Sequence, residues 1–192
     1  MTVLLIAGSP SARSRSAALL EEVGARLRGR VDVERLHIRD LSPQALLLGD
    51  AEHRSVVAAA DQVQRARAVV IATPVYKAAY SGVLKVFLDL LPQTALRHKV
   101  VLPIATGGSA NHMLALDYAL RPVLQSLAAR HILPGVYATD AQVTLFPEGT
   151  RHLGTEIAER IDDAVEALVH EIQRTPPAAF EAVPFAQVRF NV

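Results

Sequence analysis

A loop rich in hydroxyl groups and free of acidic residues follows the first apolar segment of the chain. It covers residues 8–16 and reads Gly-Ser-Pro-Ser-Ala-Arg-Ser-Arg-Ser. Its candidate anion ligands are Ser9, Arg13, Ser14, Arg15 and Ser16. A helix is expected directly after the loop, and a helix N-terminus offers unpaired N–H groups and a positive dipole that suit a phosphate. The loop has neither a Walker nor a Gly-x-Gly-x-x-Gly motif, so it predicts a monophosphate site, with a plain serine-capped polar loop as the alternative.

A second loop, residues 74–82, directly follows another apolar strand. Its candidate ligand-binding residues are Pro74, Val75, Tyr76 and Lys77. A proline at this point turns the chain sharply, and Tyr76 then places a flat aromatic ring at the edge of the sheet. A planar ligand could lie against this backbone, with N–H groups meeting its heteroatoms. The alternative is that Tyr76 and Tyr80 are ordinary half-buried loop aromatics.

A third loop follows the next apolar strand and is rich in glycine. Its candidate residues are Thr106, Gly107, Gly108 and Ser109. Because glycine has no Cβ, the backbone here can approach a ligand closely. The segment nearly matches the Gly-x-Ser-x-Gly nucleophile elbow of hydrolases, but Asn111 stands where the second glycine is required. A hydrolase that uses Ser109 is therefore a distant alternative, since nothing in the sequence defines a triad.

The composition excludes several classes of protein. The 192 residues are 51% apolar and 20% charged, with a formal net charge of +1, which fits neither a disordered chain nor a general nucleic-acid binder. The absence of cysteine excludes disulfides and thiolate chemistry, and the seven histidines show no metal-ligand spacing, so we predict no metal. The first apolar run is too short to cross a bilayer, so we expect a cytoplasmic protein that does not bind membranes.

Strands alternate with helices along the chain, and this order places the three loops at one edge of a sheet. Strands are predicted at 2–7, 31–38, 68–73, 100–105 and 132–139, and helices around 20–27, 52–66, 82–91, 111–130 and 155–174. The alternation predicts an α/β fold with a doubly wound, five-stranded parallel sheet, flavodoxin-like in its order 2-1-3-4-5. Ligands bind such sheets beyond the carboxyl ends of the strands. The domain is expected to span residues 1–174, with a tail, 175–192, that is flexible or packed on a neighbouring subunit.

The predicted helix at 111–130 contains an internal proline. Pro122 lacks an N–H group, and its ring clashes with the carbonyl four residues earlier, that of Tyr118. The helix should therefore kink or bulge around Tyr118. A plain proline kink is the simpler interpretation from the residues alone, and a π-bulge of the kind found at functional sites is the alternative.

Several segments together resemble a known family. They are Gly8-Ser9-Pro10, Ser14-Arg15-Ser16, Ala72-Thr-Pro-Val-Tyr-Lys-Ala-Ala-Tyr-Ser-Gly82, Leu90-Leu-Pro92, Val100-Val-Leu-Pro-Ile-Ala-Thr-Gly-Gly108 and Leu114-Ala-Leu-Asp-Tyr-Ala-Leu-Arg-Pro-Val123. Over about residues 2–145 the chain is similar to the NADPH-dependent FMN reductase family, above all to the reductase components of two-component alkanesulfonate monooxygenases. The family fold is flavodoxin-like. One departure is Ser11, which stands where relatives often carry an arginine.

The resemblance assigns roles to the loop residues. It implies that Ser9, Ser14, Arg15 and Ser16 bind the FMN phosphate. Residues 74–77 would border the isoalloxazine ring, and residues 106–108 would complete its pocket. Tyr118 matches an inserted tyrosine that forms a π-helix at a tetramer interface and is associated with release of flavin as a product, which favours the bulge over the kink.

The resemblance also implies an activity. NADPH would pass a hydride from its nicotinamide C4 to flavin N5, a transfer that requires no side-chain acid or base. Reduced FMN would then supply a monooxygenase that releases sulfite from alkanesulfonates, and the enzyme is expected to be a homodimer or homotetramer. The alternatives are a quinone, azo-dye or metal-ion reductase that retains its FMN, and a non-enzymatic flavodoxin-like electron carrier. Such carriers are usually strongly acidic, which the net charge of +1 does not match.

Overall fold

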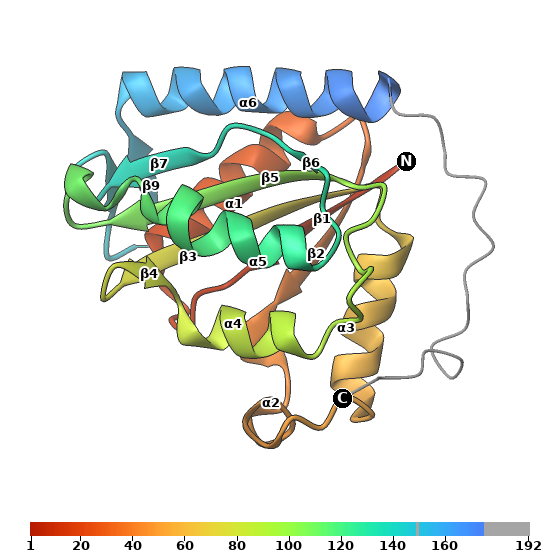
Figure 1. The fold of residues 1–192 in the computed structure, drawn as a ribbon. Helices are drawn as coiled ribbons and strands as arrows, with labels where there is room; N and C mark the ends of the chain where they lie inside the picture. Colours follow the sequence, from red (N-terminus) through yellow and green to blue (C-terminus); the bar gives the residue numbers. More distant parts are fainter. Residues whose placement is uncertain (149, 175–192) are drawn as a thin grey trace.

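The computed structural model describes residues 1–148 and 150–174, which form a mostly parallel sheet between two layers of helices (Figure 1). The strands stand in the order β2 (Asp32–His37), β1 (Thr2–Ala7), β3 (Ala68–Tyr76) and β5 (Val100–Gly107), followed by β6 (His131–Ile132) and β7 (Val136–Thr139) along the far side of β5. The predicted fold class and strand order are confirmed, with β6 and β7 together forming the fifth strand. The predicted tail, 175–192, lies outside the described residues.

The fifth strand is interrupted by a bulge. Val101 of β5 pairs with Ile132, whereas Ile104 pairs with Val136, so three steps along β5 match four steps along the fifth strand. One extra residue is therefore accommodated between β6 and β7. Gly135 lies at this point, where a Cβ would come within 2.7 Å of a buried leucine side chain.

The central strands are buried on both faces because helices cover both faces of the sheet. One face carries α1 (Arg15–Leu27) and α6 (Thr155–Arg174); the other carries α3 (Arg54–Arg65), α4 (Gly82–Asp89) and α5 (Arg121–Ser126) (Figure 1). Along β1, Val3 and Leu5 pack in the first layer, and Leu4 and Ile6 pack in the second. This alternation explains why the strands have continuous apolar sequences, as is usual for a parallel sheet.

The distortion predicted around Tyr118 in the 111–130 helix is confirmed as a π-helix, whereas the regular helix is shorter than predicted. The structure has a 3₁₀ turn η2 (Ala110–His112), a π-helix η3 (Leu116–Leu120) and the short helix α5. Pro122 lies in the first turn of α5, where its missing N–H group is tolerated, and the wider π turn directly precedes it. The chain leaves the helix at Ala128, whose φ of 66° is left-handed, so residues 128–130 are not helical.

Several short elements were not predicted from the sequence. They are η1 (Ile38–Asp40), α2 (Pro43–Leu48), β4 (Ala79–Tyr80), β8 (Val143–Leu145) and β9 (Arg151–Leu153). Strand β4 forms a hairpin with β3, and β8 forms a separate hairpin with β9. Both hairpins lie next to the predicted ligand loops. Among the described residues, no helix combines the length and the apolarity needed to cross a membrane.

Candidate functional site

The three predicted loops meet at the carboxyl edge of the sheet. The Gly8 N–H donates to the Ala72 carbonyl oxygen at 2.8 Å, so the chain continues the β1–β3 pairing into the first loop. The hydroxyl of Ser81, at the end of the second loop, donates to the Gly8 carbonyl oxygen. Pro74 at the end of β3 pairs with Thr106 at the end of β5. The sheet register and one buried serine therefore bring all three loops together.

The first loop offers hydroxyl groups beside the N-terminus of α1. Ser14 is the N-cap of this helix, and its Oγ accepts from the Ala17 N–H at 3.5 Å. The Ser14 and Ser16 hydroxyls lie 2.8 Å apart, and the buried Ser9 Oγ accepts from the Ser11 N–H at 3.2 Å. Because the first turn of α1 has no acidic residue, its dipole and free N–H groups keep a positive character that suits an anion.

The two arginines of the first loop reach across to the β8–β9 hairpin. Arg15 Nε donates to the Val143 carbonyl oxygen at 3.0 Å, and Arg15 Nη1 lies 3.5 Å from Asp140 Oδ2. Arg13 Nη2 donates to the Phe146 carbonyl oxygen at 2.9 Å. A guanidinium has five N–H groups, so these contacts leave donors on both side chains. The arginines thus hold the hairpin beside the serine loop while keeping their charge next to it.

The second loop is a strained two-residue hairpin. Lys77 and Ala78 connect β3 to β4 with φ values of 49° and 65°, a left-handed conformation in which such turns usually carry asparagine and glycine. The Tyr118 hydroxyl, from η3, donates to the Ala78 carbonyl oxygen. Tyr76 is half exposed at the edge of the sheet. A strained turn at a ligand edge persists only where its surroundings hold it, and Tyr118 supplies one such contact.

The two glycines of the third loop differ in the space around them. A Cβ on Gly107 would lie 2.5 Å from Tyr137 Oη and 3.4 Å from Val75 Cβ, so this position is fixed by packing within the protein. A Cβ on Gly108 would meet nothing nearer than Asp140 Oδ2, at 4.0 Å. Only Gly108 therefore presents an open backbone to a ligand.

Ser109 serves as a cap rather than as a nucleophile. Its Oγ accepts from the Asn111 N–H at 3.2 Å, and its carbonyl oxygen accepts from the Tyr137 hydroxyl at 2.6 Å. Among the described residues, no hydrogen bond joins Ser109 to a histidine. Burial, together with the nearby Asp140 carboxylate, raises the pKa of Tyr137, so this hydroxyl stays protonated and keeps donating to the third loop.

Sequence reasoning missed three residues at this edge. Arg39 from η1 donates to the Ser11 carbonyl oxygen at 3.1 Å and supports the first loop from the β2 side. Tyr137 packs on Gly107, and Asp140 faces Arg15. Tyr137 and Asp140 lie at the carboxyl end of the predicted fifth strand, and this position alone could have added them to the candidates.

The combined donor set suits a phosphorylated planar ligand. Hydroxyls, helix N–H groups and guanidinium groups gather at the first loop, while the second and third loops supply backbone and an aromatic ring. This chemistry fits FMN, with its phosphate at one end and its polar ring at the other. Within residues 1–148 and 150–174, no three His, Asp or Glu side chains gather as a metal site.

Comparison with known proteins identifies the family. A sequence model described as "NADPH-dependent FMN reductase" matches residues 1–144. The Escherichia coli K12 protein named FMN reductase (NADPH) is 46% identical over 179 residues, which cover 91% of each chain. The NADH-dependent FMN reductase SfnE of Pseudomonas putida is 34% identical over 174 residues, covering 86% of this chain and 91% of SfnE.

A solved structure agrees with these relatives. The apo form of the NADH:FMN oxidoreductase EMOB matches with a TM-score of 0.81 and 38% identity, over 91% of both chains. Fold, loop chemistry and sequence similarity therefore point to the same conclusion. The chain belongs to the NADPH-dependent FMN reductase family and is an NAD(P)H-dependent oxidoreductase that uses FMN and NADPH.

Proposed function

We propose that this FMN reductase takes FMN as an exchanging substrate, reduces it with NADPH, and supplies reduced FMN to an alkanesulfonate monooxygenase. The observation that carries this proposal is the contact between the Tyr118 hydroxyl in the π-helix and the Ala78 carbonyl in the hairpin beside the ring site. A single hydrogen bond between two surface segments is weak enough to break and re-form. It suits a border that must open for the flavin to leave.

The phosphate end of the flavin belongs, in this proposal, at the first loop. Ser9, Ser14 and Ser16 present hydroxyl groups there, and the first turn of α1 presents N–H groups without a competing carboxylate. Arg13 and Arg15 contribute positive charge while their other donors hold the β8–β9 hairpin. The charge-assisted contacts of a phosphate with such a set are among the stronger hydrogen bonds in proteins.

The ring end belongs at the second and third loops. Pro74, Val75, Tyr76 and Lys77 would border the ring, and Thr106 and Gly108 would place backbone groups against its polar edge, next to Ser109. When bound, FMN supplies the hydride-accepting centre that this chain lacks. The role of the chain is then to orient the two substrates and to exclude water. Gly107 acts indirectly, since its missing Cβ leaves space for the Tyr137 hydroxyl.

The partner and the assembly are inferred from sequence and surface together. The motifs around residues 72–82 and 114–123 resemble the reductases of alkanesulfonate monooxygenase systems, which supports that partner. Met113, Leu114 and Tyr118 are all more than half exposed and lie in one short stretch. Large apolar side chains gathered on a surface favour association, so we infer a homodimer or homotetramer through this stretch. Analytical ultracentrifugation of the wild type and of Leu114→Lys tests this inference; a dissociated variant is expected.

The decisive test is the visible spectrum of the purified protein, followed by steady-state NADPH oxidation with added FMN. We expect a nearly colourless protein whose turnover saturates with free FMN, and sulfite release when the monooxygenase and an alkanesulfonate are added. A tightly bound flavin that never exchanges would overturn the proposal and indicate a reductase that retains its FMN. Failure to oxidise NADPH would indicate an electron carrier.

Two variants of Tyr118 separate its ring from its hydroxyl. Tyr118→Ala removes both. Because the resemblance associates the inserted tyrosine with release of flavin, we expect the purified protein to retain more flavin and to transfer less of it to the partner. Tyr118→Phe keeps the ring and loses only the bond to Ala78, so we expect an intermediate effect, up to about tenfold in the flavin dissociation constant. A colourless, fully active Tyr118→Ala protein would contradict this role.

A further inference from the structure

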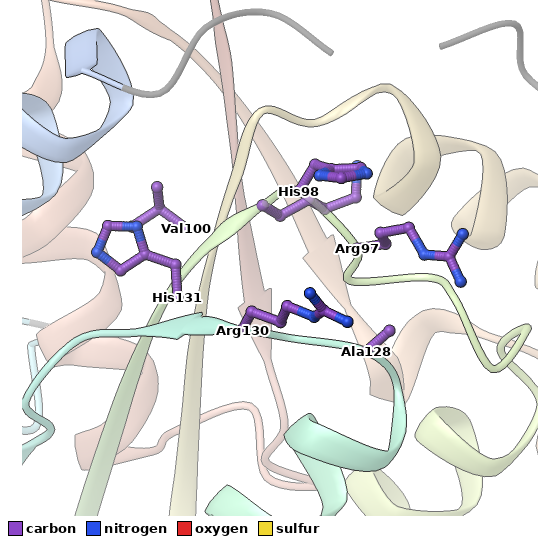
Figure 2. A pocket seen from close by; sticks show the side chains of 7 residues that line it. Arg97, His98, Val100, Ala128, Arg130 and His131 are labelled. Carbon is purple, nitrogen blue, oxygen red and sulfur yellow. The ribbon is translucent and has the colours of Figure 1, made fainter.

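A cavity lies at the opposite edge of the sheet from the three loops. Its volume is about 520 Å³, and Figure 2 shows the side chains around it. The charged or titratable residues that line it are Arg97, His98, Lys99, Arg130 and His131. They come from the two segments that enter β5 and β6, so the cavity faces the amino ends of these strands. We refer to it, with those five residues, as the cationic pocket.

The cationic pocket is well separated from the proposed flavin site. Strand β5 begins at Val100, which lines the pocket, and ends at Gly107 in the third loop. At about 3.3 Å per residue, these two positions are roughly 23 Å apart. A ligand of ordinary size could not occupy both sites, so the pocket needs its own explanation.

The positive charge of the pocket is not neutralised by its lining. None of the lining residues is acidic. Elsewhere in the structure many arginines form ion pairs. Arg26 Nη1, for example, lies 2.7 Å from Glu22 Oε2. By contrast, neither Arg97 nor Arg130 makes a side-chain hydrogen bond or ion pair with any residue that the structure describes. Beside the pocket, Glu171 Oε2 lies 3.4 Å from His131 Nε2.

Lys99 adds a partly buried ammonium group to the same place. Its Nζ donates to the carbonyl oxygens of Gln64 and Ala66, at 2.8 and 2.7 Å, which leaves one N–H for another partner. Burial and the nearby Arg67 lower the pKa of Lys99 to about 8. Both causes penalise the charge on this ammonium group, so an anion beside it would stabilise its charged form.

The backbone holds the two sides of the pocket in a fixed relation. The Leu96 N–H donates to the Leu127 carbonyl oxygen at 3.0 Å, which ties the segment before β5 to the end of α5. His98 and Ala128 both line the pocket with left-handed φ values, 61° and 66°, although neither is glycine. Such conformations are costly and are often found at ligand sites.

We propose that the cationic pocket binds a small anion that carries phosphate groups, at a site separate from the flavin site. Two guanidinium groups that have no partner within residues 1–148 and 150–174 match phosphate oxygens in geometry, and an ammonium group with one remaining donor can add a third contact. The cavity volume lies within the range of small-molecule sites, so it can hold either inorganic pyrophosphate or a nucleoside diphosphate. The phosphate groups are the shared chemistry.

The test is isothermal titration of the full-length chain with pyrophosphate, ADP and uncharged adenosine at low salt. The double variant Arg97→Ala/Arg130→Ala removes the two guanidinium groups that line the pocket. The matched control Arg28→Ala/Arg54→Ala removes the same charge from two exposed arginines outside the pocket, which likewise have no side-chain partner among the described residues. Anions that bind at the flavin site contribute equally to both variants, so their difference reports the cationic pocket.

We expect the pocket variant to bind pyrophosphate at least about tenfold more weakly than the control does. Adenosine, which has no phosphate, should not bind the pocket in either variant. ADP that binds the pocket more tightly than pyrophosphate would identify a nucleotide, and equal binding would identify a free anion. NADPH oxidation with FMN should be unchanged in both variants, which would show that they are folded. If the double variant does not fold, the single variant Arg130→Gln repeats the test. Pyrophosphate binding that is equal in pocket and control variants would overturn the proposal.

Discussion

The carboxyl and amino edges of the sheet differ in how their polar groups are hydrogen-bonded. At the carboxyl edge, Ser81 bonds the Gly8 carbonyl, and Arg13 and Arg15 bond carbonyl oxygens of the 143–146 segment. At the amino edge, the guanidinium groups of the cationic pocket have no partner among the described residues. One edge is thus built by completed hydrogen bonds that hold loops in place. The other keeps uncompensated charge in a cavity whose backbone is already fixed.

The two edges should therefore respond differently to substitution. The carboxyl edge depends on close packing and on satisfied hydrogen bonds, so a small substitution should disturb both stability and flavin reduction. The amino edge depends on charge, so its effects should follow pH and anions and should leave flavin reduction alone.

The largest effect is expected at Gly107. Gly107→Ala places a Cβ against Tyr137 Oη, so either the tyrosine or the third loop must move. Overpacking of this kind costs about 1–3 kcal/mol in the free energy of unfolding, which urea denaturation measures. We expect kcat/KM for FMN to fall by about tenfold or more, because displaced loops lose the geometry that orients the substrates.

Gly108→Ala is the matched control within the same loop. Its Cβ meets nothing nearer than 4.0 Å, so the free energy of unfolding should stay within about 0.5 kcal/mol of the wild type. The KM for FMN should nevertheless rise, because the methyl group occupies backbone open to the ligand. Equal losses of stability in the two variants would show that Tyr137 does not set the requirement at residue 107.

The next effect is expected at Ser81. Ser81→Ala leaves the buried Gly8 carbonyl without this donor and removes the oxygen that caps α4 through the Leu84 N–H. Together these losses should lower the free energy of unfolding by about 1–3 kcal/mol in chemical denaturation. The control Ser126→Ala removes an exposed hydroxyl and should change it by less than about 0.5 kcal/mol. If both serines proved equally dispensable, the carboxyl edge would not depend on this bond.

The smallest effect concerns pH at the amino edge. The pKa of Lys99 is lowered from 10.5 to about 8 in the folded chain, so between these values the unfolded chain binds more protons than the folded one. Stability should therefore rise with pH across that window, by roughly 1 kcal/mol for a partly exposed group. Lys99→Met should lose this rise, and the difference between the two unfolding curves from pH 8 to 10 isolates it. If the free energy of unfolding changed equally with pH in the wild type and in Lys99→Met, the lowered pKa of Lys99 would be contradicted.

Pyrophosphate should change the pH dependence of stability that Lys99 causes. Pyrophosphate in the cationic pocket adds negative charge beside Lys99, which raises the pKa of its ammonium group toward the ordinary value. The dependence of stability on pH should then weaken in the wild type and stay unchanged in Lys99→Met. The same addition should not alter the pH response of Gly107→Ala beyond that of the wild type, because that change lies at the other edge.

The sheet could be predicted because its signal is local. Residues 2–7, 68–73 and 100–105 are nearly continuous apolar runs, and burial on both faces requires such runs. The alternation of strands with helices then indicated a parallel sheet and the edge where the loops meet. The distortion before Pro122 was also visible, since a proline in the first turn of α5 cannot donate to the preceding turn.

The remaining features depend on contacts that are distant in sequence. Arg13 meets Phe146 and Arg15 meets Val143 across more than a hundred residues, and no local pattern in the loop indicates these partners. The short β8–β9 hairpin was missed for the same reason, because three-residue strands have little periodicity. The cationic pocket joins two arginines that the sequence separates by 33 positions, so only the folded chain brings them together.

The bulge between β6 and β7 has a consequence for how this enzyme could evolve. Ile132 packs with the α3–α5 layer and Val136 with the α1–α6 layer, although an even spacing would otherwise keep both on one face. The inserted residue thereby turns Tyr137 toward the side where its hydroxyl reaches Ser109. Deleting one codon here would exchange the two faces of β7, so a length change of one residue would remove a support of the third loop while every loop residue stayed the same.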